Sequence, residues 1–262
     1  MKTLIRVVVA GATGKMGTLI CDLISQQQDM ELYGAIVSSF GKNVGKKIQS
    51  DVIAVGDDKL DVALQGADVY VDFTTSDAAK RNLMKVPPAG VNMVIGTTGI
   101  PPEFIAKLST SIRRHQVSAV ISPNFSIGVN VFWNTCEVMA RTLKDYDVEI
   151  IEFHHNQKKD APSGTAKKAA EIISNITGIS KLVTGREGIT GPRGKEIGLH
   201  ALRGGDVIGE HTVIFAGKRE RLELTHRAHS REAFAEGVIH AIRWVWQRND
   251  GKIHSMSEVL EL

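Results

Sequence analysis

The chain has 262 residues, of which 42% are hydrophobic and 23% are charged, with a formal net charge of +3. This length fits one large domain or two smaller ones, and the apolar content is enough for compact cores. Lysines and arginines are dispersed without interleaved aromatics, which disfavours a nucleic-acid-binding protein and suits small anionic ligands.

Membrane, export and redox signals are weak. The two longest uncharged stretches, residues 86–102 and 116–136, contain prolines, glycines and asparagines, so no membrane span is predicted. Arg6 interrupts the apolar start, which argues against a secretory signal. Cys21 and Cys136 lie in helical patterns and are predicted to be buried and unpaired. We therefore expect a cytoplasmic protein.

A glycine turn follows the first predicted strand, residues 4–10. The turn has a Gly-x-x-Gly-x-x-Gly pattern and leads into an apolar helix. Its glycines let a pyrophosphate approach the backbone, and the positive helix N-terminus then faces the negative charge. The sequence predicts a dinucleotide site, with binding residues Gly11, Ala12, Thr13, Gly14, Lys15 and Met16. The alternative is a tight turn that binds nothing.

Further strands are predicted at residues 31–37, 67–73, 91–95 and 117–121, with helical segments between them, including residues 102–115. This alternation predicts an α/β fold with a Rossmann-like doubly wound parallel sheet. Ligands bind such sheets at the carboxyl ends of the strands. The small polar segments there are expected to line a nicotinamide and ribose pocket; they are Asp72 to Thr75, Gly96-Thr97-Thr98-Gly99 and Ser122-Pro123-Asn124-Phe125.

The end of the second strand bears on the choice of cofactor. NAD-binding proteins normally carry Asp or Glu there, about twenty residues past the glycines. Here Ser38 and Ser39 follow the strand, while Lys15, Lys42, Lys46 and Lys47 are expected nearby. Missing negative charge and added positive charge favour the 2′-phosphate of NADPH over NADH. The alternative is that the lysines belong to a solvated surface loop.

A second domain is predicted at residues 127–231, beginning with a helix to about Lys144 and a strand over 148–153. Thirteen residues, His154 to Ala166, then place two histidines, two lysines and two hydroxyls before a helix that runs from Ser163 to Gly178. A helix start binds anions, so this segment predicts an active site that holds a carboxylate or phosphate beside a proton donor. Because strand neighbours face opposite ways, His154 and His155 are expected to differ in role. The alternative is an ordinary helix cap beside hydrogen-bonded histidines.

The rest of the second half is rich in glycine. Residues 203–206 divide two strand-like runs and predict a long loop or hairpin, followed by strands at 207–216 and 221–225. An α+β domain with an open, mixed or antiparallel sheet covered on one face is expected. A helix over 231–248 returns to the first domain, which therefore comprises 1–126 and 232–262. Trp244 and Trp246 point to different sides, and an oligomer contact is expected for one of them.

Histidines at 154, 155, 226 and 229 raise the question of a metal. Their neighbours include many lysines and arginines, which repel a cation, and no Cys or carboxylate completes a usual ligand spacing. No metal is predicted.

The motif Glu152-Phe153-His154-His155, with Lys158 and the segment Asp160-Ala161-Pro162-Ser163-Gly164-Thr165-Ala166, closely resembles the 4-hydroxy-tetrahydrodipicolinate reductases of lysine and diaminopimelate biosynthesis. Supporting segments are Gly11 to Gly17, Asp72 to Thr74, Gly96 to Gly99, Pro123 to Ser126 and Gly209 to Thr212. The resemblance implies an NAD(P)H-dependent oxidoreductase with His154 as the acid/base residue and Lys158 as the proton donor. It implies a dicarboxylate substrate bound by His155, Ser163, Gly164 and Thr165, and a homotetramer formed through sheets of the second domain. Many members carry an acidic residue at the position of Ser38.

Two other functions share part of this pattern. A different two-domain NAD(P)-dependent dehydrogenase, of the aspartate or homoserine type, has the first half but lacks the His-His-x-x-Lys segment. A non-catalytic, NADP-sensing regulator needs the glycine turn but no proton donors. The complete second-half motif disfavours both.

Overall fold

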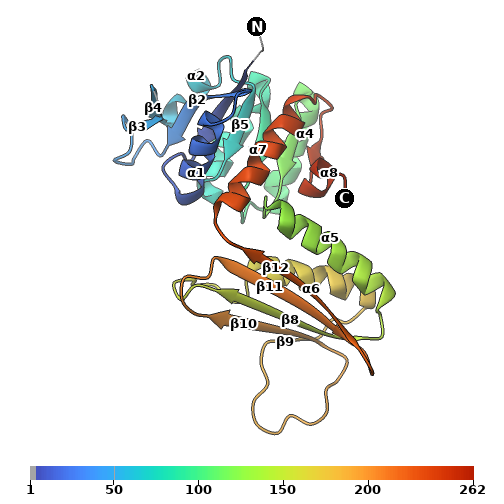
Figure 1. Cartoon of the computed structure of the whole chain (residues 1–262). Coiled ribbons are helices and arrows are strands. Elements are labelled where there is room, and N and C mark those ends of the chain that lie inside the picture. The colour runs from blue at the N-terminus through green and yellow to red at the C-terminus, as the bar shows by residue number, and fades with distance from the viewer. Residues whose placement is uncertain (1–3, 50) are drawn as a thin grey trace. The chain divides into compact units, whose positions relative to one another are not determined.

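The computed structural model describes residues 4–49 and 51–262, shown in Figure 1. It contains two compact units, the first formed by Met1–Ser126 with Phe234–Leu262 and the second by Ile127–Ala233. The sequence predicted the return to the first unit at residue 232, two residues earlier. In the described part of the chain, no helix is both long and apolar enough to span a bilayer.

The first unit contains a sheet in the order β13-β7-β6-β5-β1-β2-β4-β3. Its strands are β1 (Ile5–Ala10), β2 (Met30–Val37), β3 (Lys47–Gln49), β4 (Val52–Gly56), β5 (Val69–Asp72), β6 (Asn92–Ile95), β7 (Ala119–Ile121) and β13 (Ile253–His254). All neighbours pair in parallel except β3 and β4. The predicted Rossmann-like sheet is therefore confirmed. Its strand order reverses between β1 and β5, where such sheets bind their ligands.

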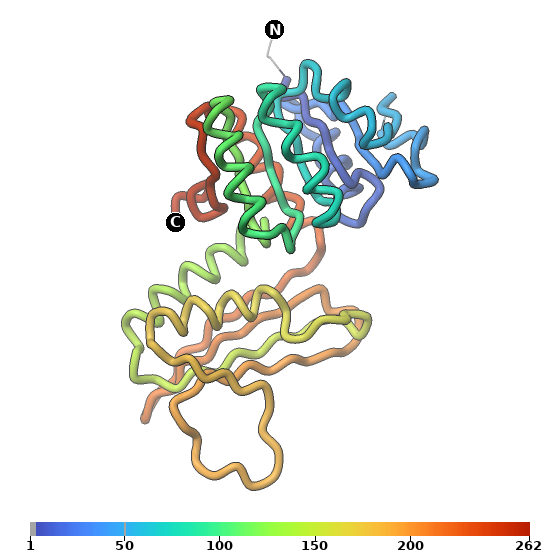
Figure 2. Tube along the Cα trace, turned by 180° about the vertical axis from the view of Figure 1, so that it is seen from behind, coloured from blue at the N-terminus to red at the C-terminus, as the bar shows by residue number. Residues whose placement is uncertain are grey.

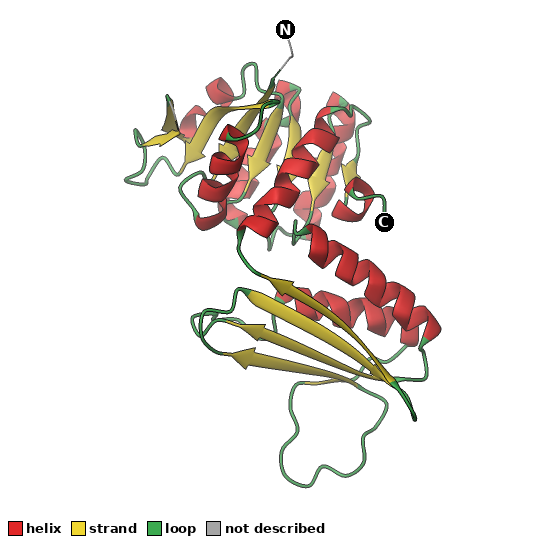
Figure 3. Cartoon of the chain, in the orientation of Figure 1, coloured by secondary structure: helices red, strands yellow, loops and turns green. Residues whose placement is uncertain are grey.

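Helices cover both faces of this sheet, as Figure 3 shows in red. They are α1 (Lys15–Ser25), α2 (Leu60–Ala63), α3 (Ser76–Asn82), α4 (Pro102–His115), α7 (Glu232–Trp246) and α8 (Met256–Val259). Alternate residues of β1 enter different cores: Val7 and Val9 pack with α1 and α7, whereas Val8 packs with α3 and α4. Strands buried on both faces are continuously apolar, which is why they were recognisable in the sequence.

The second unit contains a five-stranded sheet in the order β12-β11-β8-β10-β9. The strands are β8 (Asp147–His154), β9 (Leu182–Val183), β10 (Ile197–Arg203), β11 (Gly209–Ala216) and β12 (Arg221–Ala228). Strand β8 is parallel to β10 and antiparallel to β11, so the sheet is mixed, as predicted. Helices α5 (Ile127–Thr142) and α6 (Gly164–Thr177) both pack on one face, visible from behind in Figure 2.

The structure decides one prediction for this unit and corrects another. Of the loop or hairpin predicted at residues 203–206, the structure has a loop, because β8 lies between β10 and β11. The connection instead crosses the end of β8, where His155 N donates to Val207 O at 2.7 Å and Gly204 N donates to His154 O at 3.0 Å. The last strand extends to Ala228 rather than Thr225, which places His226 within the sheet.

The tryptophans and cysteines are accounted for within the described residues. Trp244 and Trp246 are partly buried against the core of the first unit, and Trp244 also stacks with Arg248 at 3.4 Å. Both side chains stay partly exposed, and the oligomer contact expected for one of them stays a prediction. Cys21 and Cys136 are buried and free, as predicted.

Candidate active site

The glycine turn is built by close backbone approach. A Cβ on Gly11, whose φ is +79°, would stand 2.2 Å from Phe73 O, and a Cβ on Gly17 would stand 2.0 Å from Gly11 O. Neither space can accept a side chain. The fold therefore requires glycine at both positions, whatever the turn binds.

Gly14 differs from its two neighbours in the motif. It precedes α1 with φ −77° and ψ 169°, a conformation open to any residue. A Cβ there would meet only Gly11 O, at 3.1 Å. Helix α1 has no side-chain cap at Gly14, so its first turn presents N–H groups and positive dipole to a ligand. The free space and the uncapped helix start fit a nucleotide pyrophosphate.

Side chains at the ends of β5 and β6 are tied to one another. Asp72 is buried and accepts from Tyr70 OH at 2.8 Å, Thr74 Oγ1 at 2.7 Å and Thr97 Oγ1 at 2.6 Å. Burial raises the pKa of Tyr70, and the adjacent carboxylate raises it further. The hydroxyl of Thr97 is thus engaged in structure, while Thr98 is exposed at the same strand end.

The loop after β7 is similarly braced. Ser122 Oγ donates to Asn124 O at 2.7 Å, and Asn124 Oδ1 accepts from Ser126 N at 2.9 Å. The Phe125 side chain is buried against Phe73, with ring centroids 5.7 Å apart. Pro123 is exposed, so this loop offers mainly its backbone and Pro123 to a ligand.

A cavity of about 330 Å³ lies beside the glycine turn and includes Gly11, Ser38, Asp57 and Arg81 in its lining. Asp57 accepts from Ser39 N at 2.9 Å and from Arg81 Nη2 at 3.4 Å. Burial alone would raise the pKa of Asp57, but the donors from Ser39 and Arg81 lower it. Sequence reasoning missed Arg81 because α3 is only seven residues long and carries no motif.

The loop between β2 and β3, which carries Lys42 and Lys46, also contacts the glycine turn. Asn43 Nδ2 donates to Thr13 Oγ1 at 3.0 Å, which holds the segment after Ser38 against the turn. Lys47 lies outside this loop, because it begins β3. The loop therefore adjoins the predicted nucleotide site.

In the second unit, strand β8 places a buried carboxylate and a histidine on its helix-covered face. Glu152 is fully buried and His154 is 9% exposed. Glu152 Oε2 accepts from His154 Nδ1 at 2.5 Å, and both Glu152 oxygens accept from Arg203, at 2.8 and 2.9 Å. Ser163 N also donates to Glu152 Oε1 at 3.0 Å. The sequence indicated Glu152 only as part of a motif and Arg203 only as part of a turn.

The start of α6 joins this cluster. Ser163 caps the helix by accepting from Ala166 N at 3.2 Å, and its hydroxyl lies 2.9 Å from His211 Nε2. His211 is buried edge-on to His154, with ring centroids 5.2 Å apart. Within the described residues, Nδ1 of His211 and Nδ1 of His226 are buried without a hydrogen-bond partner.

Burial controls the charge of these groups. It lowers the pKa of His211 to about 3, assisted by the nearby His154 and His226. Burial also lowers the pKa of His154, with the charges of Lys158 and Arg203 adding to the effect and Glu152 opposing it. For Glu152, burial is outweighed by the donors from Arg203 and His154, so its pKa is lowered. The site thus holds neutral histidines around an ionised carboxylate.

The remaining predicted site residues lie before or within the first turn of α6. Lys158 is half-buried, and its Nζ donates to Asp160 Oδ1 at 2.9 Å. His155 lies just past the strand and is more exposed than His154, consistent with different roles for the two. A Cβ on Gly164 would meet no atom within 4 Å, so open space adjoins this first helical residue. Trp133 Nε1 donates to Thr165 O at 3.1 Å, which anchors the same turn.

Fold and site together define a two-domain, nucleotide-binding oxidoreductase. The chain matches the family profile described as dihydrodipicolinate reductase, N-terminus, over residues 5–125 and its C-terminus counterpart over residues 128–260. The chain belongs to the dihydrodipicolinate reductase family, whose members use NAD(P)H.

Named relatives match along their whole length. A 4-hydroxy-tetrahydrodipicolinate reductase from Methanosarcina barkeri is 49% identical, and the match covers 99% of this chain and 100% of that protein. One from Methanocaldococcus jannaschii is 51% identical, with 99% and 98% covered. The solved structure of a dipicolinate-bound dihydrodipicolinate reductase from Paenisporosarcina sp. TG-14 is 26% identical with a TM-score of 0.81, covering 98% of this chain and 99% of that chain.

Proposed function

We propose that this protein reduces 4-hydroxy-tetrahydrodipicolinate to tetrahydrodipicolinate with NAD(P)H, releasing water, in the biosynthesis of lysine and diaminopimelate. The observation that carries the proposal is the cluster of Glu152, His154 and Lys158 at the start of α6, in a chain that matches reductases of this name throughout. The dipicolinate bound to the similar solved structure supports a small cyclic dicarboxylate as the substrate.

The first unit carries the residues proposed to hold the cofactor. Residues Gly11 to Met16 would surround the pyrophosphate. The N–H groups of Gly11, Ala12 and Gly14 already donate to backbone carbonyl oxygens, so those of Thr13, Lys15 and Met16 would bind it. The strand ends at Gly96, Thr97 and Thr98 and at Ser122 to Phe125 would line the rest of the nucleotide. When bound, the nicotinamide supplies a hydride to the substrate.

NADPH is the proposed preferred cofactor. No carboxylate follows directly after β2, where Ser38 and Ser39 stand, and Arg81 adds a guanidinium to the adjoining cavity. Arginine is well suited to a phosphate because its planar donors match the oxygens. Asp57 moderates this preference, because it is already paired with Arg81.

The second unit carries the residues proposed to hold the dicarboxylate and to move protons. Gly164 and Thr165 in the first turn of α6, capped by Ser163, offer an N-terminal anion site, and His155 adds a ring at the strand end. Lys158 would donate a proton and place positive charge near the electron density that hydride transfer creates. His154 would exchange protons with the substrate as the acid/base residue.

A coupled assay tests the function and ranks the cofactors. The substrate is generated from pyruvate and aspartate semialdehyde by its synthase, and cofactor oxidation is followed at an absorbance of about 340 nm. We expect synthase-dependent oxidation, with kcat/KM about tenfold higher for NADPH, because one hydrogen bond to a charged group contributes roughly 1.5 kcal/mol or more. Binding of either cofactor without oxidation would contradict the assigned reaction, and a preference for NADH would contradict the ranking.

The uncovered face of the second sheet supports the proposed homotetramer. Ile151, Ile214 and Leu202 alternate with core residues and so point away from α5 and α6. Light scattering is expected to give about four times the chain mass of 28.5 kDa. Leu202→Asp is expected to lower that mass, whereas Val62→Asp, at an exposed site in the first unit, serves as the control. A monomeric native protein would contradict the proposal.

A further inference from the structure

Glu152 takes no part in the proton steps above, yet it is the most enclosed charge in the site. It is fully buried, and its two oxygens receive hydrogen bonds from Arg203, Ser163 N and His154. The guanidinium of Arg203 donates to both oxygens, and such bidentate arginine–carboxylate pairs are among the strong hydrogen-bonded pairs in proteins. A carboxylate with these donors is ionised and can only accept hydrogen bonds.

This arrangement determines which nitrogen of His154 carries the proton. The 2.5 Å contact with Glu152 Oε2 requires a hydrogen on Nδ1, because the ionised carboxylate has none to give. A neutral imidazole has one N–H, so its Nε2 then presents a lone pair. Burial, Lys158 and Arg203 all favour the neutral ring.

The Nε2 edge of the ring is kept open by a glycine. A Cβ on Gly209, at the start of β11, would stand 3.0 Å from His154 Nε2 and 3.4 Å from its Cδ2. Gly209 is not among the glycines with positive φ, so its backbone conformation does not demand glycine. The missing side chain instead leaves room at the one nitrogen that Glu152 does not occupy.

The charged groups that face His154 come from every neighbouring element. Glu152 lies on β8 itself, Arg203 on β10 and Lys158 in the loop before α6. His211 on β11 contacts the ring edge and is neutral, since its pKa is about 3. His226 on β12 lies behind His211, with ring centroids 6.4 Å apart. Apart from Glu152, none of these groups presents a carboxylate to the ring.

We propose that Glu152 and Arg203 are positioning residues that hold His154 as its Nδ1–H tautomer, so that His154 enters the reaction as a proton acceptor at Nε2 and Lys158 acts as the donor. This inference rests on the proposed function. It adds to the roles given above the residues that fix the tautomer of His154 and the nitrogen at which His154 reacts.

Loss of water from the hydroxylated ring uses both roles. Nε2 of His154 takes a proton from the ring carbon next to the one that carries the hydroxyl. The C–H electron pair forms the new double bond, and the C–O bond breaks as Lys158 protonates the leaving hydroxyl. After hydride addition, protonated His154 returns its proton to the substrate atom that gained the charge. Solvent restores the proton of Lys158 before hydride addition, so its positive charge is present when hydride transfer creates negative charge. Each turnover consumes one proton and one hydride and releases one water.

The wild-type protein provides the first test, without substrate. Nitrogen-15 NMR at neutral pH, with the His154 signals assigned by their loss in His154→Gln, distinguishes the tautomers. We expect a protonated Nδ1 and an unprotonated Nε2. A proton on Nε2, whether in the other tautomer or in an imidazolium, would overturn the proposal even if the enzyme reduces its substrate.

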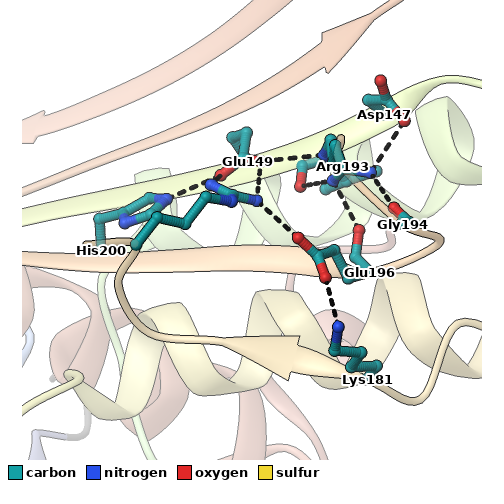
Figure 4. Close-up of polar contacts among 9 residues, drawn as sticks. Asp147, Glu149, Lys181, Arg193, Gly194, Glu196 and His200 are labelled. Carbon is teal, nitrogen blue, oxygen red and sulfur yellow. Dashed lines mark hydrogen bonds and ion pairs between the residues drawn. The ribbon is translucent and has the colours of Figure 1, made fainter. Parts of the chain in front are cut away.

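A matched pair of variants provides the second test. Glu149 lies on the same strand but on the opposite face, where it accepts from His200 Nε2 at 2.7 Å and from Arg193 Nε at 3.1 Å, as Figure 4 shows. It also accepts from Arg186 Nη2 at 2.9 Å. Donors from these side chains outweigh burial and lower the pKa of Glu149 to about 2. Glu149→Gln therefore removes a comparable carboxylate without touching His154.

We expect Glu152→Gln to reverse the tautomer, because its amide can donate to Nδ1, and to lower kcat by about 10²- to 10⁴-fold while NADPH binding is retained. Both variants are expected to lower Tm, but Glu149→Gln should leave the His154 tautomer unchanged. An unchanged tautomer or kcat in Glu152→Gln would contradict the proposal. A wild-type protein with the expected tautomer and no reductase activity would instead contradict only the proposed function.

Discussion

Replacing Lys158 with alanine, or His154 with glutamine, is expected to lower kcat by about 10²- to 10⁴-fold, the usual contribution of a positioned acid or base. NADPH affinity should be retained, because the proposed nucleotide residues all belong to the first unit. Steady-state kinetics and a fluorescence titration of NADPH measure the two quantities separately. Lys159→Ala is the matched control, since that side chain is exposed while Lys158 is half-buried against Asp160.

The pH dependence of kcat/KM provides a second test of the role of His154. Burial lowers the pKa of His154 below its ordinary 6.5, so the ring is neutral from neutral pH down into the acidic range. A proton acceptor works only when neutral, so kcat/KM should fall only as the pH drops through this lowered pKa. The acid limb is expected to lie below pH 6.5 and to be lost in His154→Gln. A loss of cofactor affinity equal to the loss of kcat would mean that these residues are misassigned.

Local patterns carried most of the fold prediction. The strand, turn and helix over residues 4–17 were predictable because each depends on adjacent residues. The other strands of this sheet were predictable because burial on both faces makes them continuously apolar. The helix predicted to begin near Ser163 and to end at Gly178 is confirmed as α6, with Ser163 as its N-cap and Gly178 as its C-cap, because helix ends have strong local preferences. The short strand β3 was not predicted, because its pairing with β4, rather than its own three residues, defines it.

Pairing between distant strands was not predictable in the same way. The sequence left a long loop or a hairpin open at residues 203–206, because no periodicity indicates that β8 separates β10 from β11. The same nonlocal pairing brings Arg203 to Glu152, 51 residues away. The density of polar side chains therefore indicated His154 and Lys158 as candidates, but no local pattern indicated Arg203 as a partner of Glu152.

Glycines illustrate the difference between structural and functional need. Gly11 and Gly17 share a motif with Gly14, and the sequence treats all three alike. The structure distinguishes them. Gly11 has a positive φ, a Cβ on Gly17 would stand 2.0 Å from Gly11 O, and a Cβ on Gly14 would meet only Gly11 O, at 3.1 Å. A glycine can also serve to let a ligand approach the backbone closely.

Alanine at Gly17 and alanine at Gly14 are therefore expected to have different effects. Gly17→Ala is expected to lower the free energy of unfolding by about 3 kcal/mol, because its Cβ would stand 2.0 Å from Gly11 O and 2.9 Å from Ala12 Cα. Gly14→Ala should cost about 1 kcal/mol or less, the usual range for a change at a helix N-cap. Its methyl group would nevertheless occupy the pyrophosphate space and weaken NADPH binding by about tenfold or more.

Denaturant unfolding and cofactor titration of the two variants separate these effects. Gly17→Ala should unfold at a lower denaturant concentration than the wild type, and it should lose cofactor binding only as the first unit unfolds. Gly14→Ala should unfold near the wild-type midpoint and still bind NADPH poorly. Because Gly14 has no structural contact that a methyl group would disrupt severely, wild-type affinity in this variant would show that the pyrophosphate does not lie at the glycine turn.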